Sequence, residues 1–254
     1  MAELHEGRVI WVTGGASGIG RATVETVLSE GGSAVASDLP KADLAWAEGD
    51  DRIAIARGDV TESESNDAAV ALALERFGRI DGAALNAGVV AGADLVDGSL
   101  EAFDRVMEVN VRAVLLGIRA AAPAMSRGSA ISVTASISGL RADPGLWAYN
   151  TSKAGVINLV RSASMDLASR GIRINAVCPG PTETGMTETM DAAVRDEIRS
   201  RIPLQRWGTS IEVAQAHSFL LSSRASFITG AHLAVDGGMS ANGGQFSPPR
   251  FDDA

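Results

Sequence analysis

A short apolar segment that runs directly into a glycine-rich loop and then into a helical pattern most constrains the fold of this chain. Residues 8–13 (R-V-I-W-V-T) are typical of a strand that is covered on both faces of a parallel sheet. Gly14, Gly15, Gly18 and Gly20 follow within one short loop. Glycines allow a sharp turn and a close approach to a diphosphate, and the free N–H groups at a helix start favour its negative charge. The order strand, loop, helix predicts a diphosphate-binding unit.

A second predicted strand, residues 33–37, ends at Asp38. This is about 20 residues beyond the glycine loop, where a dinucleotide-binding fold places the acid that binds the adenosine ribose. A carboxylate there accepts hydrogen bonds from both ribose hydroxyls and repels a 2′-phosphate, so the sequence favours NAD over NADP. Arg21 and Lys41 are close enough in sequence to meet a phosphate, and an ordinary turn or helix-capping role is the alternative for Asp38.

The remaining chain alternates strands with helices. Further strands are predicted over residues 51–57, 80–85, 130–136, 173–178 and 231–235, and helices over 100–125 and 149–169. Capping-box patterns at Thr61 with Glu64 and at Thr209 with Glu212 predict helices to about Phe77 and Leu221. No repeat or composition shift marks a linker. The pattern predicts an α/β fold, a single domain over residues 1–254 with a doubly wound parallel sheet and helices on both faces.

Charge and cysteine content exclude several classes of protein. The formal net charge is −9 and the pI about 4.9, so no basic face is expected for nucleic acid or anionic lipid. Cys178 is the only cysteine, which excludes an intramolecular disulfide, and we expect it to be a buried strand residue. The three histidines lack metal-ligand spacing, so no metal is predicted. No secretory signal pattern or membrane-spanning apolar run is present, and a cytoplasmic location is expected.

Ser136, Tyr149 and Lys153 form the pattern that carries chemistry. Tyr149 and Lys153 are one helical turn apart, so the phenol and the ammonium share a helix face. Together with T-G-x-x-x-G-x-G from Thr13, with Asn86-Ala87-Gly88 and with the segment from Pro179 to Thr184, this pattern resembles the short-chain dehydrogenase/reductase family. The resemblance covers nearly the whole chain and implies a Rossmann fold.

The resemblance also implies the roles of individual residues. The catalytic residues would be Asn110, Ser136, Tyr149 and Lys153. The residues that bind the cofactor would be Gly14, Ser17, Gly18, Ile19, Gly20, Asp38, Asp59, Val60, Asn86, Ala87, Gly88, Tyr149, Lys153, Pro179, Gly180, Thr182 and Thr184.

The expected mechanism depends on the ionisation of Tyr149. A free tyrosine has a pKa near ~10, and a nearby ammonium and the positive nicotinamide favour the phenolate. Tyr149 would then exchange a proton with the substrate oxygen, which Ser136 holds. Lys153 would also bind the nicotinamide ribose, and Asn110 would hold a water that links Lys153 to solvent.

An apolar pocket for the substrate is expected beside these groups. Its predicted lining residues are Ser136, Ser138, Val90, Leu146, Trp147, Tyr149, Met186 and Met190. Residues 185–207 depart from the alternating pattern and are predicted to form a lid, or else to pack on the body of the domain. Residues 240–254 are expected to be an irregular tail.

Three hypotheses of function remain open on the sequence. The first is an NAD-dependent oxidoreductase that transfers a hydride between NAD(H) and a small secondary alcohol or ketone. The second is a 3-oxoacyl reductase that acts on an acyl carrier protein, for which Arg127 and Arg170 would supply basic groups. The third is a dinucleotide-binding sensor without turnover. The resemblance also implies a homotetramer.

Overall fold

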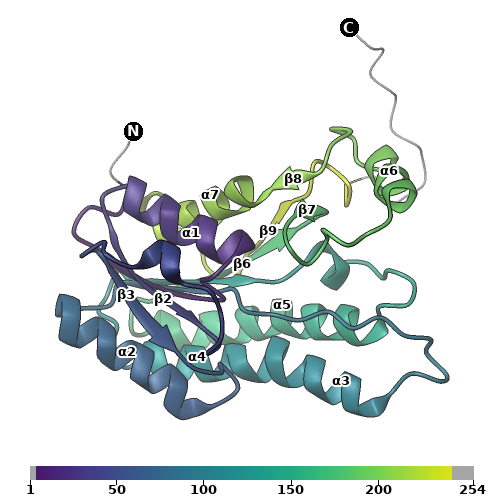
Figure 1. The fold of residues 1–254 in the computed structure, drawn as a ribbon. Coiled ribbons are helices and arrows are strands. Elements are labelled where there is room, and N and C mark those ends of the chain that lie inside the picture. The colour runs from purple at the N-terminus through teal and green to yellow at the C-terminus, as the bar shows by residue number, and fades with distance from the viewer. Residues whose placement is uncertain (1–3, 242–254) are drawn as a thin grey trace, which may run out of the picture.

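A seven-stranded sheet lies at the centre of the molecule (Figure 1) in this computed structural model, which describes residues 4–241. Each neighbouring pair of strands is parallel. In spatial order the strands are β3 (Ile53–Arg57), β2 (Ser33–Asp38), β1 (Val9–Thr13), β4 (Gly82–Leu85), β5 (Ala130–Thr134), β6 (Arg173–Pro179) and β9 (His232–Val235). The strand order reverses between β1 and β4, which confirms the predicted doubly wound α/β sheet.

Helices cover both faces of the sheet because successive strand residues point to opposite sides. Val9 and Trp11 pack into one core, and Ile10 and Val12 into the other. In Figure 1 one layer lies above the sheet and the other below it. The upper layer consists of α1 (Gly18–Ser29) and α7 (Ser210–Leu221), and the lower layer of α2 (Ser63–Phe77), α3 (Leu100–Met107), α4 (Ala113–Ala121) and α5 (Trp147–Ala168).

The helical segment predicted over residues 100–125 is present but contains an irregular turn and ends earlier than predicted. A π-helical turn, η2 (Glu108–Arg112), separates α3 from α4, and α4 ends at Ala121. Asn110 lies in this turn, and its side chain bonds to the backbone of Val89 through both its oxygen and its nitrogen. These two bonds fix Asn110 against the neighbouring loop, at the point where the α-helical pattern is interrupted.

The two predicted capping boxes have different outcomes. Thr209 and Glu212 form the expected reciprocal bonds at the start of α7. The box at Thr61 and Glu64 is absent, because Asp59 Oδ1 accepts from both the backbone N–H and the hydroxyl of Thr61, at 2.9 and 2.8 Å. The Thr61 side chain is therefore occupied, and α2 starts later, at Ser63.

A small unit stands above the carboxyl edge of the sheet (Figure 1). It comprises β7 (Thr182–Glu183), α6 (Ala192–Ser200) and β8 (Gly208–Thr209), and β7 pairs with β8 in parallel. The remaining short segments are η1 (Ala45–Ala47), η3 (Ile137–Gly139) and η4 (Ser223–Ala225). The predicted tail falls outside the described residues from position 242 onward. Within residues 4–241, no helix is both long enough and apolar enough to cross a membrane.

Gly20 allows α1 to pack against the loop that precedes it. A Cβ at this position would lie 2.0 Å from the Gly14 carbonyl oxygen and 2.8 Å from Asn86 Nδ2. We expect Gly20→Ala to lower the free energy of unfolding by about 2–3 kcal/mol, because neither neighbour has room to move. Denaturant unfolding measures this change.

Gly155 in α5 provides the matched control. A Cβ there would meet only Val111 Cγ2, at an ordinary 3.7 Å. Gly155→Ala is expected to raise stability by about 0.5–1 kcal/mol through helix propensity. Equal effects of the two substitutions would contradict the packing role of Gly20.

Candidate active site

A cavity of about 870 Å³ lies at the carboxyl edge of the sheet and joins the glycine loop to Tyr149. Its walls come from the segments that follow β1, β2, β3, β4, β5 and β6, because parallel strands all end at the same edge. The predicted site residues that line it are Gly14, Ser17, Gly18, Ile19, Asp38, Asp59, Val60, Asn86, Ala87, Gly88, Val90, Ser136, Ser138, Leu146, Tyr149, Lys153, Pro179, Gly180, Thr182, Thr184, Met186 and Met190. Segments far apart in the chain thus meet around one cavity.

The glycine loop forms an open cradle at one end of this cavity. Gly14 and Gly18 have φ values of +68° and +52°, which L side chains rarely adopt. A Cβ on Gly14 would lie 3.0 Å from Asn86 Nδ2. Thr13 Oγ1 accepts from the backbone N–H groups of Asn86 and Ala87, at 2.9 and 3.0 Å. The bare backbone and the helix start of α1 fit a dinucleotide diphosphate.

Gly20 does not line the cavity, and its predicted contact with the cofactor stays a prediction. Its role is the helix packing described above. Asp38 is where the prediction puts it, at the end of β2 in the cavity wall. The backbone N–H groups of Ala16 and Leu39 donate to its two carboxylate oxygens, at 2.9 and 2.8 Å. These bonds fix the orientation of the carboxylate.

Ser136, Tyr149 and Lys153 come together in the deeper part of the cavity. Lys153 is 3% exposed, and its Nζ donates to the Thr134 carbonyl oxygen at 2.9 Å. The same Nζ lies 5.5 Å from the centre of the Tyr149 ring. Ser136 is hydrogen-bonded to Tyr149, and its Oγ also accepts from the Ser138 N–H at 3.1 Å. The serine, the phenol and the ammonium therefore share one site.

The chain by itself shifts the pKa of Tyr149 in the direction opposite to the prediction. Burial raises the pKa of the phenol, and the hydrogen bond from Ser136 opposes this rise only in part. Asp143 adds to the rise through charge repulsion. Burial also lowers the pKa of Lys153 to about 8, so part of its ammonium charge is lost near that pH. The predicted lowering of the Tyr149 pKa invoked the positive nicotinamide together with Lys153, and it stays a prediction for the site with bound cofactor.

Asn110 lies behind the cavity wall and does not line the cavity. Its Nδ2 donates to the Val89 carbonyl and to Ser152 Oγ, at 2.9 and 3.0 Å, and it is fully buried. A Cβ on Gly88 would lie 3.2 Å from Asn110 Oδ1 and 3.4 Å from Lys153 Nζ. Asn110 Oδ1 and Lys153 Nζ therefore both lie close to the position that a Cβ of Gly88 would occupy.

A buried polar network, which the sequence analysis did not predict, supports the floor of the site. His217 Nδ1 lies 2.8 Å from Ser132 Oγ, and its Nε2 lies 3.0 Å from Thr134 Oγ1. Thr134 Oγ1 donates to Asn86 Oδ1 at 2.9 Å. Because that bond uses the only proton of the hydroxyl, His217 Nε2 must carry the proton that it donates to Thr134. Burial lowers the pKa of His217 to about 3, which keeps the ring neutral.

The substrate end of the cavity differs from the prediction at two points. Trp147 does not line it, because its ring stacks on Phe103 with centroids 5.5 Å apart. Arg141 and Asp143 do line it, although neither is among the predicted site residues. Two charged residues shortly before Tyr149, in an otherwise apolar stretch, were the available signal.

Cys178 is fully buried in β6, as predicted, and burial raises the pKa of its thiol to about 11. Such a thiol is a poor nucleophile. Among residues 4–241, no three His, Cys, Asp or Glu side chains gather in a way that could hold a metal ion.

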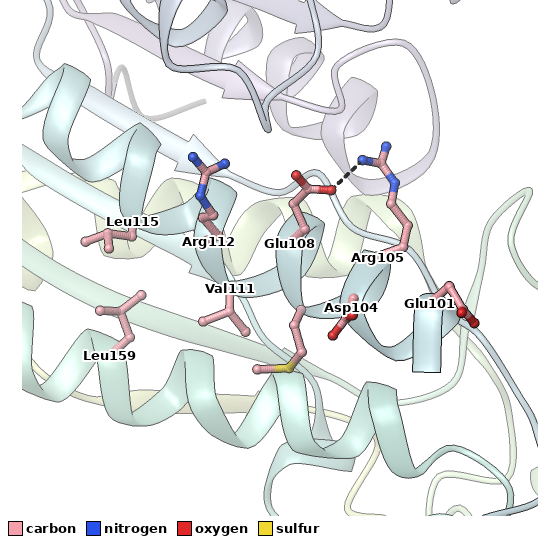
Figure 2. A pocket seen from close by; sticks show the side chains of 9 residues that line it. Glu101, Asp104, Arg105, Glu108, Val111, Arg112, Leu115 and Leu159 are labelled. Carbon is pink, nitrogen blue, oxygen red and sulfur yellow. Dashed lines mark hydrogen bonds and ion pairs between the residues drawn. The ribbon is translucent and has the colours of Figure 1, made fainter. Parts of the chain in front are cut away.

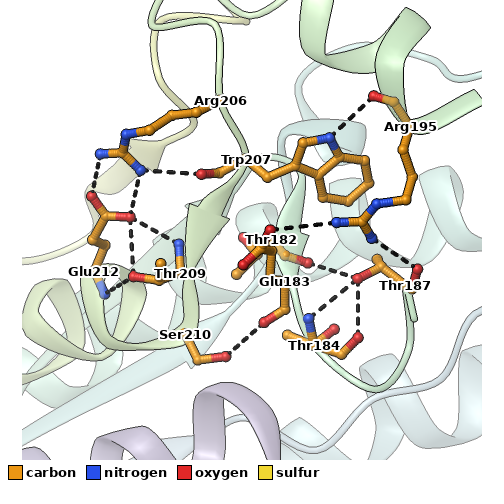
Figure 3. A network of polar contacts seen from close by, with 10 residues as sticks. All are labelled: Thr182, Glu183, Thr184, Thr187, Arg195, Arg206, Trp207, Thr209, Ser210 and Glu212. Atoms are coloured by element: carbon orange, nitrogen blue, oxygen red, sulfur yellow. Dashed lines mark hydrogen bonds and ion pairs between the residues drawn. The ribbon is translucent and has the colours of Figure 1, made fainter. Parts of the chain in front are cut away.

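The segment predicted to be a lid both lines the cavity and packs on the body. Met186, Met190 and Ile198 line the cavity, whereas Ile202 is 1% exposed. Figure 3 shows how this segment is cross-linked by polar contacts. The Arg195 guanidinium lies 4.4 Å from the Trp207 ring centre, and Trp207 Nε1 donates to the Arg195 carbonyl at 3.2 Å. The segment is therefore held together by side-chain contacts of its own, which a simple loop lacks.

Arg206 and Glu212 anchor the far end of the same segment (Figure 3). Arg206 Nη1 donates to Glu212 Oε2 at 2.9 Å, and the Thr209 N–H donates to the same oxygen at 2.8 Å. The hydrogen bond from Arg206 lowers the pKa of Glu212 to about 2. Glu212 therefore stays ionised and holds β8 to the start of α7.

The fold and the cavity define a dinucleotide-binding oxidoreductase, and comparisons with known proteins agree. A family model described as enoyl-(acyl carrier protein) reductase matches residues 14–240. The chain is 39% identical to 2-(R)-hydroxypropyl-CoM dehydrogenase of Xanthobacter autotrophicus, over 92% of this chain and 99% of that protein. It is 37% identical to a 3-oxoacyl-[acyl-carrier-protein] reductase of Thermotoga maritima, over 92% and 98%.

A third relative and a solved structure complete the comparison. The 2,5-dichloro-2,5-cyclohexadiene-1,4-diol dehydrogenase of Sphingobium indicum is 38% identical, over 92% of this chain and 98% of that protein. The crystal structure of levodione reductase superposes with a TM-score of 0.89 at 31% identity, and covers 94% of this chain and 99% of that one. This chain belongs to the short-chain dehydrogenase/reductase family, whose members are oxidoreductases that act on CH–OH groups with a nicotinamide dinucleotide.

Tyr149 is the only tyrosine of the chain, so the ultraviolet absorbance of tyrosinate reports this residue alone. Because burial raises the pKa of Tyr149 above the ordinary 10.0, we expect Tyr149 to be less than half ionised at pH 10 in the protein without cofactor. Ser136→Ala should raise the pKa further, because it removes the hydrogen bond that opposes the shift. Circular dichroism over the same pH range serves as a control for unfolding. Half-ionisation of Tyr149 below pH 10 would contradict the conclusion that burial raises the pKa of this phenol.

Proposed function

We propose that this protein is an NAD-dependent dehydrogenase or reductase that interconverts a small secondary alcohol and its ketone. The observation that carries the proposal is the continuity of one cavity from the glycine loop and Asp38 to Ser136, Tyr149 and Lys153. Such a cavity holds a dinucleotide and a small organic molecule side by side. The names of the relatives, which include dehydrogenases of a secondary alcohol and of a cyclic diol, support an alcohol or ketone as substrate.

The residues of this chain have distinct roles in the proposal. The residues of the glycine loop and of Asn86 to Gly88 hold the diphosphate and ribose side of the cofactor, and Pro179, Gly180, Thr182 and Thr184 hold its nicotinamide side. The bound nicotinamide supplies the hydride acceptor or donor. Ser136 holds the substrate oxygen, and Tyr149 takes its proton in oxidation and returns it in reduction. Lys153 binds the nicotinamide ribose, and Asn110 holds a water next to the lysine.

The protonation chemistry explains why a cofactor is needed for Tyr149 to act as a base. Without it, burial disfavours the phenolate. A positive charge placed beside the phenol favours the phenolate. Oxidised cofactor carries such a charge on its nicotinamide, and Lys153, whose pKa of about 8 is close to neutral pH, exchanges protons readily. The base is thereby activated only in the loaded site.

A preference for NAD over NADP is supported by the charges around Asp38. Two nearby arginines have other partners: Arg21 pairs with Glu25 at 2.8 Å and lies over the Trp46 ring, and Arg57 donates to the carbonyls of Pro40 and Ala42. A 2′-phosphate would therefore meet a fixed carboxylate.

Tyr149→Phe is expected to bind NAD with little change in affinity and to lose turnover by at least about a thousandfold, because the proton carrier is gone. Fluorescence titration with NADH measures binding, and absorbance of the reduced nicotinamide measures turnover with a panel of secondary alcohols. Retained turnover would remove Tyr149 from the assigned role. NAD binding without turnover in the unmodified protein would instead favour a sensor.

Asp38→Ala is expected to narrow the ratio of kcat/KM for NAD over NADP by at least about tenfold, because a charged hydrogen-bond acceptor and a repulsive charge are both removed. Asp43→Ala, which removes an exposed acid from the same loop outside the cavity wall, serves as the control. An unchanged ratio would mean that another group recognises the ribose.

A 3-oxoacyl reductase that acts on a carrier-bound thioester is the second candidate, and the relative of Thermotoga maritima favours it. Arg127 and Arg170 precede β5 and β6, at the amino edge of the sheet, whereas the cavity is at the carboxyl edge. Within one chain they are therefore poorly placed to guide a carrier to the cavity. Turnover of acetoacetyl thioesters compared with simple ketones separates the two candidates.

We also propose a homotetramer, with contacts through the lower helix layer. Figure 2 shows a groove there, where Val111 and Leu115 face Leu159 of α5. Leu115 is 41% exposed and Met165, further along α5, is 77% exposed. Such apolar side chains on a helix surface suit contact with another copy. Sedimentation tests the oligomeric state, and a cytoplasmic location remains a prediction.

A further inference from the structure

An acidic subsite lies in the substrate end of the cavity, where most of the wall is apolar. Ser138, Arg141 and Asp143 all line the cavity there, next to Val90, Leu146 and Met186. Ser138 Oγ donates to Asp143 Oδ2 at 2.6 Å, and Arg141 Nη1 donates to Asp143 Oδ1 at 2.5 Å. Charged groups in an apolar wall are costly unless they are paired or used.

Asp143 and Ser138 retain acceptor capacity, whereas Arg141 Nε is a buried donor without a hydrogen-bond partner. A carboxylate offers about four lone-pair sites, and two of those on Asp143 are occupied by Ser138 and Arg141. Ser138 has a single hydroxyl proton, which it gives to Asp143, so only its lone pairs remain. The Asp143 side chain is 25% exposed, so a molecule in the cavity can reach it. The free group that suits these acceptors is a hydroxyl.

Backbone hydrogen bonds also hold the loop that carries Asp143. The backbone carbonyl of Asp143 accepts from Asn150 Nδ2 at 2.9 Å and from the Leu146 N–H at 3.3 Å. The backbone N–H of Arg141 donates to the Ile137 carbonyl at 3.1 Å. These bonds fix the loop through the backbone, which leaves the carboxylate available for another role.

The subsite is adjacent to the catalytic centre. The Ser138 N–H donates to Ser136 Oγ at 3.1 Å, so the two serines lie in the same turn. Asp143 is also close enough to raise the pKa of Tyr149 through its charge. A small substrate held by Ser136 and Tyr149 therefore has the acidic subsite within its own length.

We propose that Asp143, which Ser138 and Arg141 hold by hydrogen bonds, accepts a hydrogen bond from a second hydroxyl of the substrate, so that the preferred substrate is a compact diol. The inference rests on the proposed function and adds the substrate class. One carbinol loses its hydride to the nicotinamide and its hydroxyl proton to Tyr149, which forms a hydroxyketone. The second hydroxyl donates to Asp143 and is unchanged by the reaction.

The test compares kcat/KM for cyclohexanol, for the cyclohexanediols, and for the monomethyl ethers of those diols, all with NAD. The ether keeps the second oxygen but cannot donate a hydrogen bond. We expect at least one diol to exceed both cyclohexanol and its own ether by about ten- to hundredfold, as a hydrogen bond to a charged acceptor implies. Equal values for diol, ether and cyclohexanol would overturn the inference.

Asp143→Asn and Ser138→Ala test the residues themselves. Each should reduce the preference for the diol over its ether to within a few-fold. Asp166→Asn, which removes the same charge from an exposed site on α5 outside the cavity wall, should leave the preference intact. The ratio is informative because any change in the ionisation of Tyr149 affects diol and ether equally. A preference that survives in a folded Asp143→Asn or Ser138→Ala protein would also overturn the inference.

The failures of the two proposals are distinguishable. If no alcohol or ketone in the panel is turned over although NADH binds, the proposed function itself is wrong. If kcat/KM for cyclohexanol and for the ethers equals that for the diols, the proposed function holds. The acidic subsite then does not select the substrate.

Discussion

The bond from the buried Lys153 ammonium to the Thr134 carbonyl is the interaction on which the rest of the site depends. It joins α5, which carries Tyr149, to the end of β5, which leads into Ser136. An ammonium that is 3% exposed needs such a partner, since burial without one costs several kcal/mol. The bond thus fixes the helix against the strand end and brings three separate side chains to one point. It also places a group with a pKa of about 8 beside the phenol.

The Thr134 residue that accepts this bond is itself held from the opposite side of the sheet. Its hydroxyl bonds to His217 of α7 and to Asn86, which follows β4. Because His217 is fully buried and neutral, the network contributes fixed dipoles and no net charge. The helix layer remote from Tyr149 is therefore coupled to the floor of the cavity by hydrogen bonds. Asn86 extends this coupling to the glycine loop through Thr13.

The cavity separates two kinds of recognition. Backbone atoms and glycines dominate the end that suits a dinucleotide, where close approach matters more than side-chain chemistry. Side chains such as those of Val90, Leu146 and Met190 dominate the other end. They come from loops and from the small unit above the sheet. Loops tolerate change without loss of the fold, so substrate choice resides there. The paired charges of Arg141 and Asp143 belong to this variable part.

Local signals in the sequence determined the architecture and most of the site. Strand, glycine loop and helix in immediate succession predicted the sheet, and chain order placed Asp38, Asn86, Ser136 and Gly180 at one edge, because parallel strands end together. Contacts between distant segments required the tertiary structure. It alone placed Trp147 against Phe103 rather than in the cavity, and Gly20 under the loop rather than at its surface. It also decided the direction of the Tyr149 pKa shift, because desolvation depends on every atom around the phenol and not on the spacing of Tyr149 from Lys153.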